Sequence, residues 1–224
     1  MILLGSIVNG GAVVVGGLVG MFVGKLLPER LRTSVMAALS LMTIGIAVPG
    51  LLKSNNALIP IISMVVGTLI GELLDIDSAV NKLGEKLQKR FSGSRVTEGF
   101  VTGSLVFAVG ALAVMGPLES GLQHQHSLLF SKSVIDGVAS IMFASTMGLG
   151  VALSGVTVFA VEGTIAMLAA VVAPYLGDVV VNEITFVGSL LIVGISLNLL
   201  GLTKLRILNM TPAILLPILL CRFM

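Results

Sequence analysis

The stretch from Lys132 to Ala170, KSVIDGVASIMFASTMGLGVALSGVTVFAVEGTIAMLAA, decides how the chain must fold. It contains two apolar segments, which we expect to fold back on each other at residues 154–155. Glu162 stands inside the second segment, and no charged residue is nearer to it in the sequence than Asp178. A charged acidic residue at the centre of a membrane helix costs about 2.5–3.5 kcal/mol, so Glu162 is expected to face away from lipid.

The composition of the full chain is that of an integral membrane protein. Hydrophobic residues make up 56% of the 224 residues and charged residues only 11%, and the mean hydropathy is +1.11. Soluble domains carry about 25% charged residues. The first 24 residues lack the basic start of a secretory signal, so we expect a retained first membrane helix. The single cysteine, Cys221, excludes an intrachain disulfide.

Apolar segments long enough to cross a bilayer recur along the chain. With about 20 residues per crossing, we predict an all-α polytopic membrane protein, residues 1–224 in one membrane domain, with about eight transmembrane helices. Their approximate bounds are 2–24, 33–52, 57–74, 97–118, 133–153, 156–176, 184–202 and 207–223.

The distribution of basic residues predicts an orientation in the membrane. Ten of the 13 Lys and Arg residues fall in the connections after the first, third and seventh predicted spans. The other three, Lys53, Lys132 and Arg222, are assigned to the opposite side. By the positive-inside rule, the N-terminus is predicted outside and the connection 75–96 in the cytoplasm.

Short matches between the two halves of the chain predict an internal repeat. Gly-Ser at 5–6 matches 103–104, Ser-Val at 34–35 matches 133–134, and Gly-Thr at 67–68 matches 163–164, at nearly constant offset. Because each unit has three spans, the second unit is expected to insert inverted, as in many transporters. The predicted units are repeat A at 1–77, inverted repeat B at 97–178 and a partial third repeat at 184–223.

Helix-breaking residues occupy corresponding positions of the two repeats. Span two carries Pro49 and Gly50, and span five carries Gly148 and Gly150. Proline removes a backbone donor and glycine weakens the helical preference. Matched breaks in inverted halves are typical of transporter binding sites. The alternative is that the first pair simply ends its span and the glycines ease helix packing.

Small residues recur every four positions along the first predicted helix, at Ala12, Gly16, Gly20 and Gly24. This spacing lets helix backbones approach closely, and it indicates packing within the subunit or between subunits. We expect a homo-oligomer.

Deep polar residues suggest a path through the bundle. Measured from a turn at 154–155, Glu162 lies roughly 10 Å and Asp136 about 28 Å along neighbouring helices, so no direct pair is expected. Glu162 either lines a substrate or ion path and exchanges protons, or is a neutral acid hydrogen-bonded to another helix. The candidate path residues are Glu162, Asn9, Ser6, Asp136, Ser140, Ser145, Thr164 and Asn198.

The connection between the two predicted repeats has its own pattern. Apolar and basic residues alternate at helical spacing over 78–92, which predicts a cytoplasmic amphipathic helix that lies on the inner leaflet or is simply solvated. The sequence has no GxSxG, HExxH, phosphate-loop or dinucleotide-binding motif. We therefore expect neither an enzyme nor a cofactor, a metal site or a nucleic-acid partner.

The stretches GSIVNGGAVVVGGLVG, residues 5–20, and KSVIDGVASIMFASTMGLGVALSGVTVFAVEGTIAMLA, residues 132–169, resemble the YdfK/YqgA-like family of bacterial inner-membrane proteins. The resemblance covers essentially the whole chain and implies a polytopic inner-membrane protein, often described as a transporter, without an established substrate or catalytic residue. It also implies an amide in many relatives where this chain has Glu162. This difference favours a polar lining of the path over an obligatory proton carrier.

Together these features predict a small secondary transporter, or a channel-like permeation protein, for an unidentified ion or small solute in the lipid bilayer. The alternative is a membrane scaffold or sensor that does not transport and acts through the cytoplasmic helix at 78–92.

Overall fold

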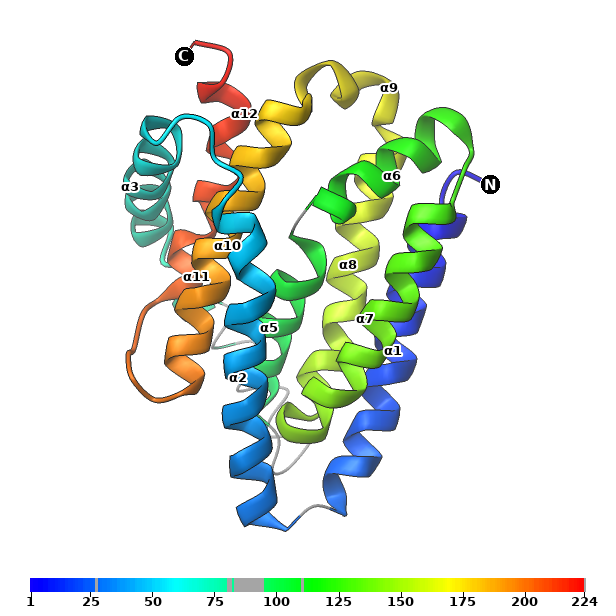
Figure 1. Ribbon diagram of the computed structural model, residues 1–224, viewed down its shortest axis with the longest axis vertical. Helices are drawn as coiled ribbons and strands as arrows, with labels where there is room; N and C mark the ends of the chain where they lie inside the picture. Colours follow the sequence, from blue (N-terminus) through cyan, green and yellow to red (C-terminus); the bar gives the residue numbers. More distant parts are fainter. Residues whose placement is uncertain (27, 80–81, 83–94, 110, 224) are drawn as a thin grey trace.

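The computed structural model describes residues 1–26, 28–79, 82, 95–109 and 111–223, which form a bundle of helices (Figure 1). The predicted all-helical class is confirmed for these residues. The amphipathic helix predicted at 78–92 falls largely outside them. The helices are α1 Leu4–Lys25, α2 Glu29–Leu51, α3 Leu58–Leu74, α5 Val96–Ala108, α6 Ala111–Gln123, α7 Ser127–Met147, α8 Leu149–Met167, α9 Ala169–Val172, α10 Asp178–Leu199, α11 Ile207–Met210 and α12 Leu216–Leu220, with 3₁₀ turns η1 Ala173–Tyr175 and η2 Thr211–Ile214.

Within the described residues, five helices are long and apolar enough to cross a membrane: α1, α2, α7, α8 and α10. A sixth span results if α5 and α6, which meet at an angle of 59°, are counted as one. The helix α3 and the segment 207–220 are apolar but shorter. The structure therefore supports a polytopic membrane protein, while the count of eight spans and the inverted repeat remain predictions.

The long helices alternate in direction along the chain. Figure 1 shows α1 running away from the N-terminus, α2 returning, and both chain termini at the same end of the bundle. Helix α1 lies against both α7 and α8, α5 lies against α8, and α2 packs on α10. The short helices α11 and α12 pack on α3 beside α10.

The glycine stripe of α1 brings this helix into close contact with α7. A Cβ atom on Gly16, Gly20 or Gly24 would lie 2.2–2.4 Å from a backbone carbonyl oxygen of α7. A side chain at any of these positions would therefore push the two helices apart. The stripe serves packing within the chain.

The chain reverses at Gly148, and the predicted turn at 154–155 is wrong. Gly148 is the single residue between α7 and α8, and its φ of 72° suits glycine, which has no Cβ to clash. Residues 154–155 lie inside α8. A Cβ on Gly150 would lie 2.0 Å from the Val96 carbonyl oxygen, so this glycine permits close packing of α8 on α5.

The matched breaks predicted inside two spans are also wrong. Gly148 separates two helices, and Pro49 and Gly50 lie in the last turn of α2, which ends at Leu51. Pro49 has no amide hydrogen to donate to the Gly45 carbonyl, four residues earlier in α2. A Cβ on Gly50 would lie 2.0 Å from the Ser189 hydroxyl of α10, so Gly50 allows the α2–α10 contact.

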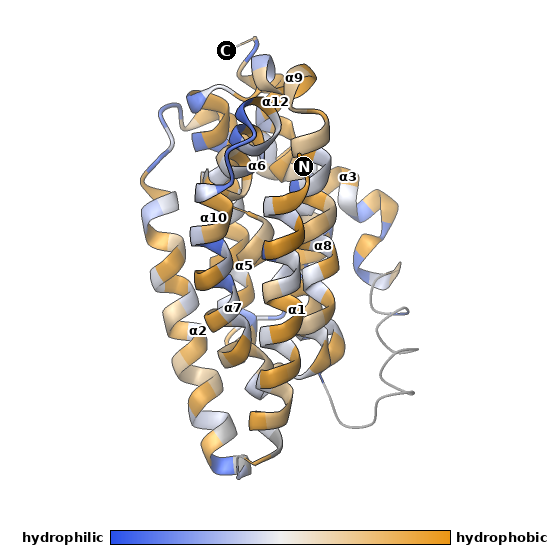
Figure 2. Ribbon diagram, turned by 90° about the vertical axis from the view of Figure 1, so that its right-hand side faces the viewer, coloured by the Kyte–Doolittle hydropathy of each residue, from blue (hydrophilic) through white to orange (hydrophobic). Residues whose placement is uncertain are grey.

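The bundle exposes apolar side chains and buries polar ones. Val15, Phe22 and Val138 are each more than half exposed, whereas Asn9 and Glu162 are completely buried. Figure 2 shows hydrophobic residues along much of α1, α2 and α8 and hydrophilic residues near the start of α2. An apolar exterior around a polar interior suits a protein surrounded by lipid.

Candidate functional site

The position of the turn places two acidic residues at the same depth in the bundle. Asp136 lies twelve residues before Gly148 and Glu162 fourteen residues after it. At 1.5 Å per residue these positions are about 18 Å and 21 Å from the turn on adjacent helices. The expectation that Asp136 and Glu162 are far apart is wrong. It places the turn at residues 154–155, whereas the chain reverses at Gly148.

Lys132 lies between these two carboxylates. It is one helical turn before Asp136 on α7 and only 6% exposed. Its Nζ contacts Asp136 Oδ2 and lies 3.3 Å from Glu162 Oε1. It also donates a hydrogen bond of 2.6 Å to the Phe107 carbonyl oxygen. The ammonium group thus makes two hydrogen bonds, to Asp136 and Phe107, and a further ion pair with Glu162.

Sequence reasoning wrongly assigned Lys132 to an outer connection. The positive-inside rule assigns lysines to the connections between membrane helices, but α7 begins at Ser127 and includes Lys132. The signal that favours a buried lysine is local: the apolar residues Leu128, Leu129 and Phe130 precede Lys132, and Asp136 follows four residues later.

Helix α5 ends beside the carbonyl that binds Lys132. Helix α5 ends at Ala108, and Val109 has extended backbone angles. In a continuous helix the Phe107 carbonyl would accept from the amide of residue 111. The C-terminal end of a helix carries a partial negative charge, which favours a cation. The sequence predicts one continuous span over residues 97–118 and therefore does not predict the break between α5 and α6.

Asn9 of α1 connects the two carboxylates. Its Nδ2 donates to Glu162 Oε1 at 2.8 Å and to Asp136 Oδ2 at 3.1 Å. The short side chain reaches both because α1 and α8 cross closely at the next residue. A Cβ on Gly10 would lie 2.9 Å from the Gly155 carbonyl oxygen.

The charge cluster, defined as Asn9, Lys132, Asp136 and Glu162, is unusual in its charge balance. It contains one cationic and two acidic side chains, none more than 9% exposed. Two of its oxygens, Asn9 Oδ1 and Glu162 Oε2, are buried without a hydrogen-bond partner. Buried charges and unpaired polar atoms cost free energy. Such a cluster can bind a proton, a cation or a solute with a donor group.

The structure brings three of the predicted path residues together, namely Asn9, Asp136 and Glu162. Ser6 is completely buried one turn before Asn9 on α1, and its hydroxyl has no hydrogen-bond partner. It therefore belongs to the surroundings of the charge cluster.

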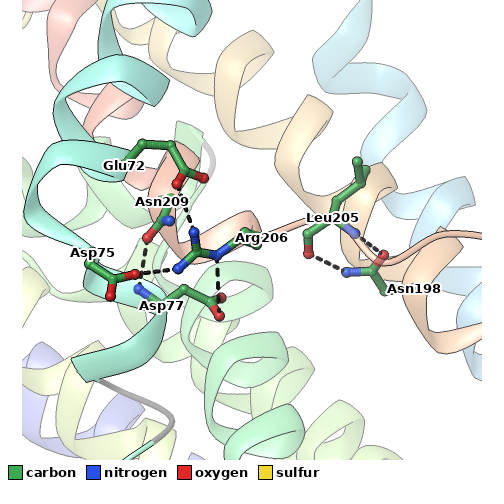
Figure 3. Close-up of polar contacts among 7 residues, drawn as sticks. All are labelled: Glu72, Asp75, Asp77, Asn198, Leu205, Arg206 and Asn209. Carbon is green, nitrogen blue, oxygen red and sulfur yellow. Dashed lines mark hydrogen bonds and ion pairs between the residues drawn. The ribbon is translucent and has the colours of Figure 1, made fainter.

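The other predicted path residues lie outside the cluster. Ser140 and Ser145 donate hydrogen bonds of 2.8 Å and 2.7 Å to carbonyl groups of their own helix, where α7 contacts α1. Thr164 is exposed on α8. Asn198 lies near the end of α10. Its Nδ2 donates to the Leu205 carbonyl oxygen at 2.8 Å, and its Oδ1 accepts from the Leu205 backbone amide at 2.9 Å. It thereby holds the loop between α10 and α11 (Figure 3).

A second polar group links α3 to the start of α11 (Figure 3). Arg206 pairs with Glu72 at 2.8 Å, with Asp75, and with Asp77 at 3.9 Å. A hydrogen bond from the Ser78 hydroxyl, followed by the Arg206 guanidinium, holds the pKa of the Asp75 carboxyl below its ordinary value. The Arg206 side chain is 44% exposed, so these pairs contribute little each. They position the chain rather than form a chemical site.

A pocket of about 400 Å³ lies near this group, between α5, α10 and α11. Its lining combines charged, polar and apolar side chains, including Arg95, Glu98, Thr102, Asn198 and Ile207. This volume is in the range of small-molecule sites.

Comparisons with known proteins give a family and no established activity. A family model described as "Protein of unknown function (DUF554)" matches residues 4–222. The chain is 30% identical to "Uncharacterized membrane protein YdfK" of Bacillus subtilis (strain 168), over 96% of this chain and 94% of the relative. It is 27% identical to "Uncharacterized protein YqgA" of Escherichia coli (strain K12), over 95% of this chain and 94% of the relative. No solved structure matches the chain.

Proposed function

We propose that this chain, which belongs to the DUF554 family of proteins of unknown function, acts as a small secondary transporter or channel-like permeation pathway for an ion or small solute. The observation that carries the proposal is the buried contact of Lys132 with Asp136, Glu162 and the carbonyl of Phe107. Ionisable residues inside membrane helices are costly and mark ion and substrate paths. Broken helices beside such residues are typical of transporters.

A purely structural role accounts poorly for the charge cluster. Replacing a buried ion pair by apolar residues of similar size is often neutral or stabilising by about 1–4 kcal/mol. Apolar side chains would thus hold α1, α7 and α8 together at least as well. The two unpaired oxygens of Asn9 and Glu162 add a further cost. A cluster that reduces stability in this way is better explained by function.

The proposed path runs along α5. The 400 Å³ pocket is lined by residues of the first half of α5, including Thr102, and the Phe107 carbonyl at its other end contacts Lys132. These two positions are about 8 Å apart along the helix. Because five residues also turn a helix by about 140°, a small solute in the pocket would reach the charge cluster by moving around α5 as well as along it.

The proposal includes a membrane topology and an assembly. The chain would cross the bacterial inner membrane eight times, with α3 and 207–220 as short spans, and with the N-terminus outside. The alternating helix directions support repeated crossing of the membrane (Figure 1), and the orientation rests on the distribution of Lys and Arg. A homo-oligomer would cover part of the exposed apolar face of α3, where Leu69 and Leu73 are 61% and 87% exposed.

Flux measurements in proteoliposomes test the proposal. Purified wild type, Glu162→Gln and Glu162→Leu are reconstituted at equal density and compared across a panel of ions and small solutes. Glu183→Gln serves as the matched control, because Glu183 is also completely buried but binds the loop at 54–56 instead of the cluster.

We expect at least one solute to cross faster than in protein-free vesicles. Its flux should fall by about tenfold or more in Glu162→Leu, which corresponds to at least 1.4 kcal/mol, and persist in Glu183→Gln. The absence of flux for every solute would contradict transport. An unchanged flux in Glu162→Leu would contradict the role of Glu162.

A further inference from the structure

The two oxygens of the Glu162 side chain have different surroundings. Oε1 accepts a hydrogen bond from Asn9 Nδ2 at 2.8 Å and lies 3.3 Å from Lys132 Nζ. Oε2 is buried and has no partner. An ionised carboxylate accepts on both oxygens, whereas a protonated one has a carbonyl oxygen and a hydroxyl group. The arrangement fits a carbonyl at Oε1 and a hydroxyl at Oε2.

Asn9 provides a matching acceptor. Its amide nitrogen binds Glu162, while its Oδ1 is buried without a partner. A primary amide and a carboxylic acid pair through two hydrogen bonds, one from N–H to the acid carbonyl and one from the acid hydroxyl to the amide oxygen. A proton on Oε2 makes this oxygen a donor, and Asn9 Oδ1, on the amide group that already binds Oε1, is an unpartnered acceptor that such a donor would satisfy.

The charge balance of the cluster requires the same proton. The charged groups that face Glu162 are Lys132 and Asp136, both from α7. Helix α1 contributes the neutral Asn9 and α5 a backbone carbonyl. Among the described residues, Glu119 of α6 makes no ion pair or hydrogen bond with the cluster. Two carboxylates and one ammonium leave one negative charge, which one proton cancels.

We infer that the charge cluster is a binding site for one exchangeable proton, held on Oε2 of Glu162 and shared with Oδ1 of Asn9. Asp136 stays ionised in its ion pair with Lys132. Binding breaks one O–H bond of a hydronium ion, forms the O–H bond at Oε2 and leaves a water molecule, and release reverses this step without a redox change. The inference rests on the proposed function, since it identifies the proton as the ion to which the path is coupled. It departs from the expectation, drawn from the family resemblance, that Glu162 only lines the path.

Infrared difference spectroscopy of the reconstituted protein tests this site without any transported solute. The carbonyl stretch of a protonated carboxylic acid is separate from the bands of ionised carboxylates, and it shifts when H₂O is replaced by D₂O. Spectra are recorded over a pH series for wild type, Glu162→Gln, Asp136→Asn and the control Glu183→Gln. Gln at 162 keeps the size of the side chain and its pairing with Asn9.

We expect a protonated-acid band in wild type and Glu183→Gln that is missing in Glu162→Gln. In Asp136→Asn the excess negative charge is removed, so the band should appear only at lower pH than in wild type. If Glu162→Gln does not fold, the pH shift of the band in Asp136→Asn tests the inference by itself. A band that is equal in wild type and Glu162→Gln, or unshifted in Asp136→Asn, would overturn the inference.

Two further results separate the possible explanations. If the band is absent at every pH, while Na⁺ raises the unfolding temperature of wild type but not of Glu162→Gln, the two oxygens bind a metal cation and the proton site is wrong. If the band behaves as expected but no solute crosses the proteoliposomes, the proton site stands and the proposed transport fails.

Discussion

Replacement of Lys132 by Met removes the cation that faces both carboxylates of the cluster. Met keeps a similar length and fits an apolar surrounding, so the main loss is electrostatic. Removing one partner of a buried ion pair costs about 3–5 kcal/mol, because the other charge is left uncompensated. The loss of the hydrogen bond to the Phe107 carbonyl accounts for about 1–3 kcal/mol of this. We expect Lys132→Met to lose about 3–5 kcal/mol of unfolding free energy.

Equilibrium unfolding in mixed micelles with a rising fraction of denaturing detergent, followed by circular dichroism, measures this loss. Lys204→Met is the matched control, since Lys204 is exposed and should change stability by less than about 0.5 kcal/mol. The double variant Lys132→Met/Asp136→Asn should recover about 2 kcal/mol or more, because no unpaired charge remains beside a protonated Glu162. A loss under about 1 kcal/mol for Lys132→Met, or a double variant no better than the single one, would refute the electrostatic reasoning.

Three further predictions follow from the packing and the loops. Gly20→Ala should lose about 1–3 kcal/mol of unfolding free energy, because its Cβ would meet an α7 carbonyl oxygen at 2.3 Å. Gly11→Ala on the same helix has free space and should be neutral or slightly stabilising. Unfolding in detergent measures both variants. Glu183→Ala should expose the loop 52–57 to hydrogen exchange and limited proteolysis, because the carboxylate accepts hydrogen bonds from this loop; unchanged protection would contradict that role. Gly148→Ala should lower the unfolding temperature, since alanine is strained at a φ of 72°.

The sequence predicts the long helices well and the positions of the turns less well. Apolar segments of about 20 residues identify α1, α2, α7, α8 and α10, because hydrocarbon admits few other structures. Both Gly148 and the pair at 154–155 look like turns in an apolar stretch. Ser154 remains helical because its hydroxyl donates to the Val151 carbonyl at 2.6 Å, and Gly155 allows close contact with α1. The contact of Gly155 with α1 comes from tertiary structure and cannot be deduced from the local pattern.

Three residues of the candidate site were predictable one by one, but the site as a unit was not. Asn9, Asp136 and Glu162 stand out as polar groups in apolar segments. Lys132 does not, because basic residues usually lie in connections and only its buried partners compensate for its position. The contact with the Phe107 carbonyl depends on the end of α5, which hydropathy does not reveal because both sides of the break are apolar. The cluster emerges only when the turn at Gly148 fixes the depth of α7 and α8.

The most direct test of the account is the charge movement after a rapid pH jump in reconstituted vesicles adsorbed on a solid-supported membrane. The account holds that a buried Glu162 binds and releases a proton through a path to water, so wild type should give a transient current without any added solute. The current should vanish in Glu162→Gln and persist in Glu183→Gln. A wild type without a transient, or a Glu162→Gln variant with the same transient, would contradict the account.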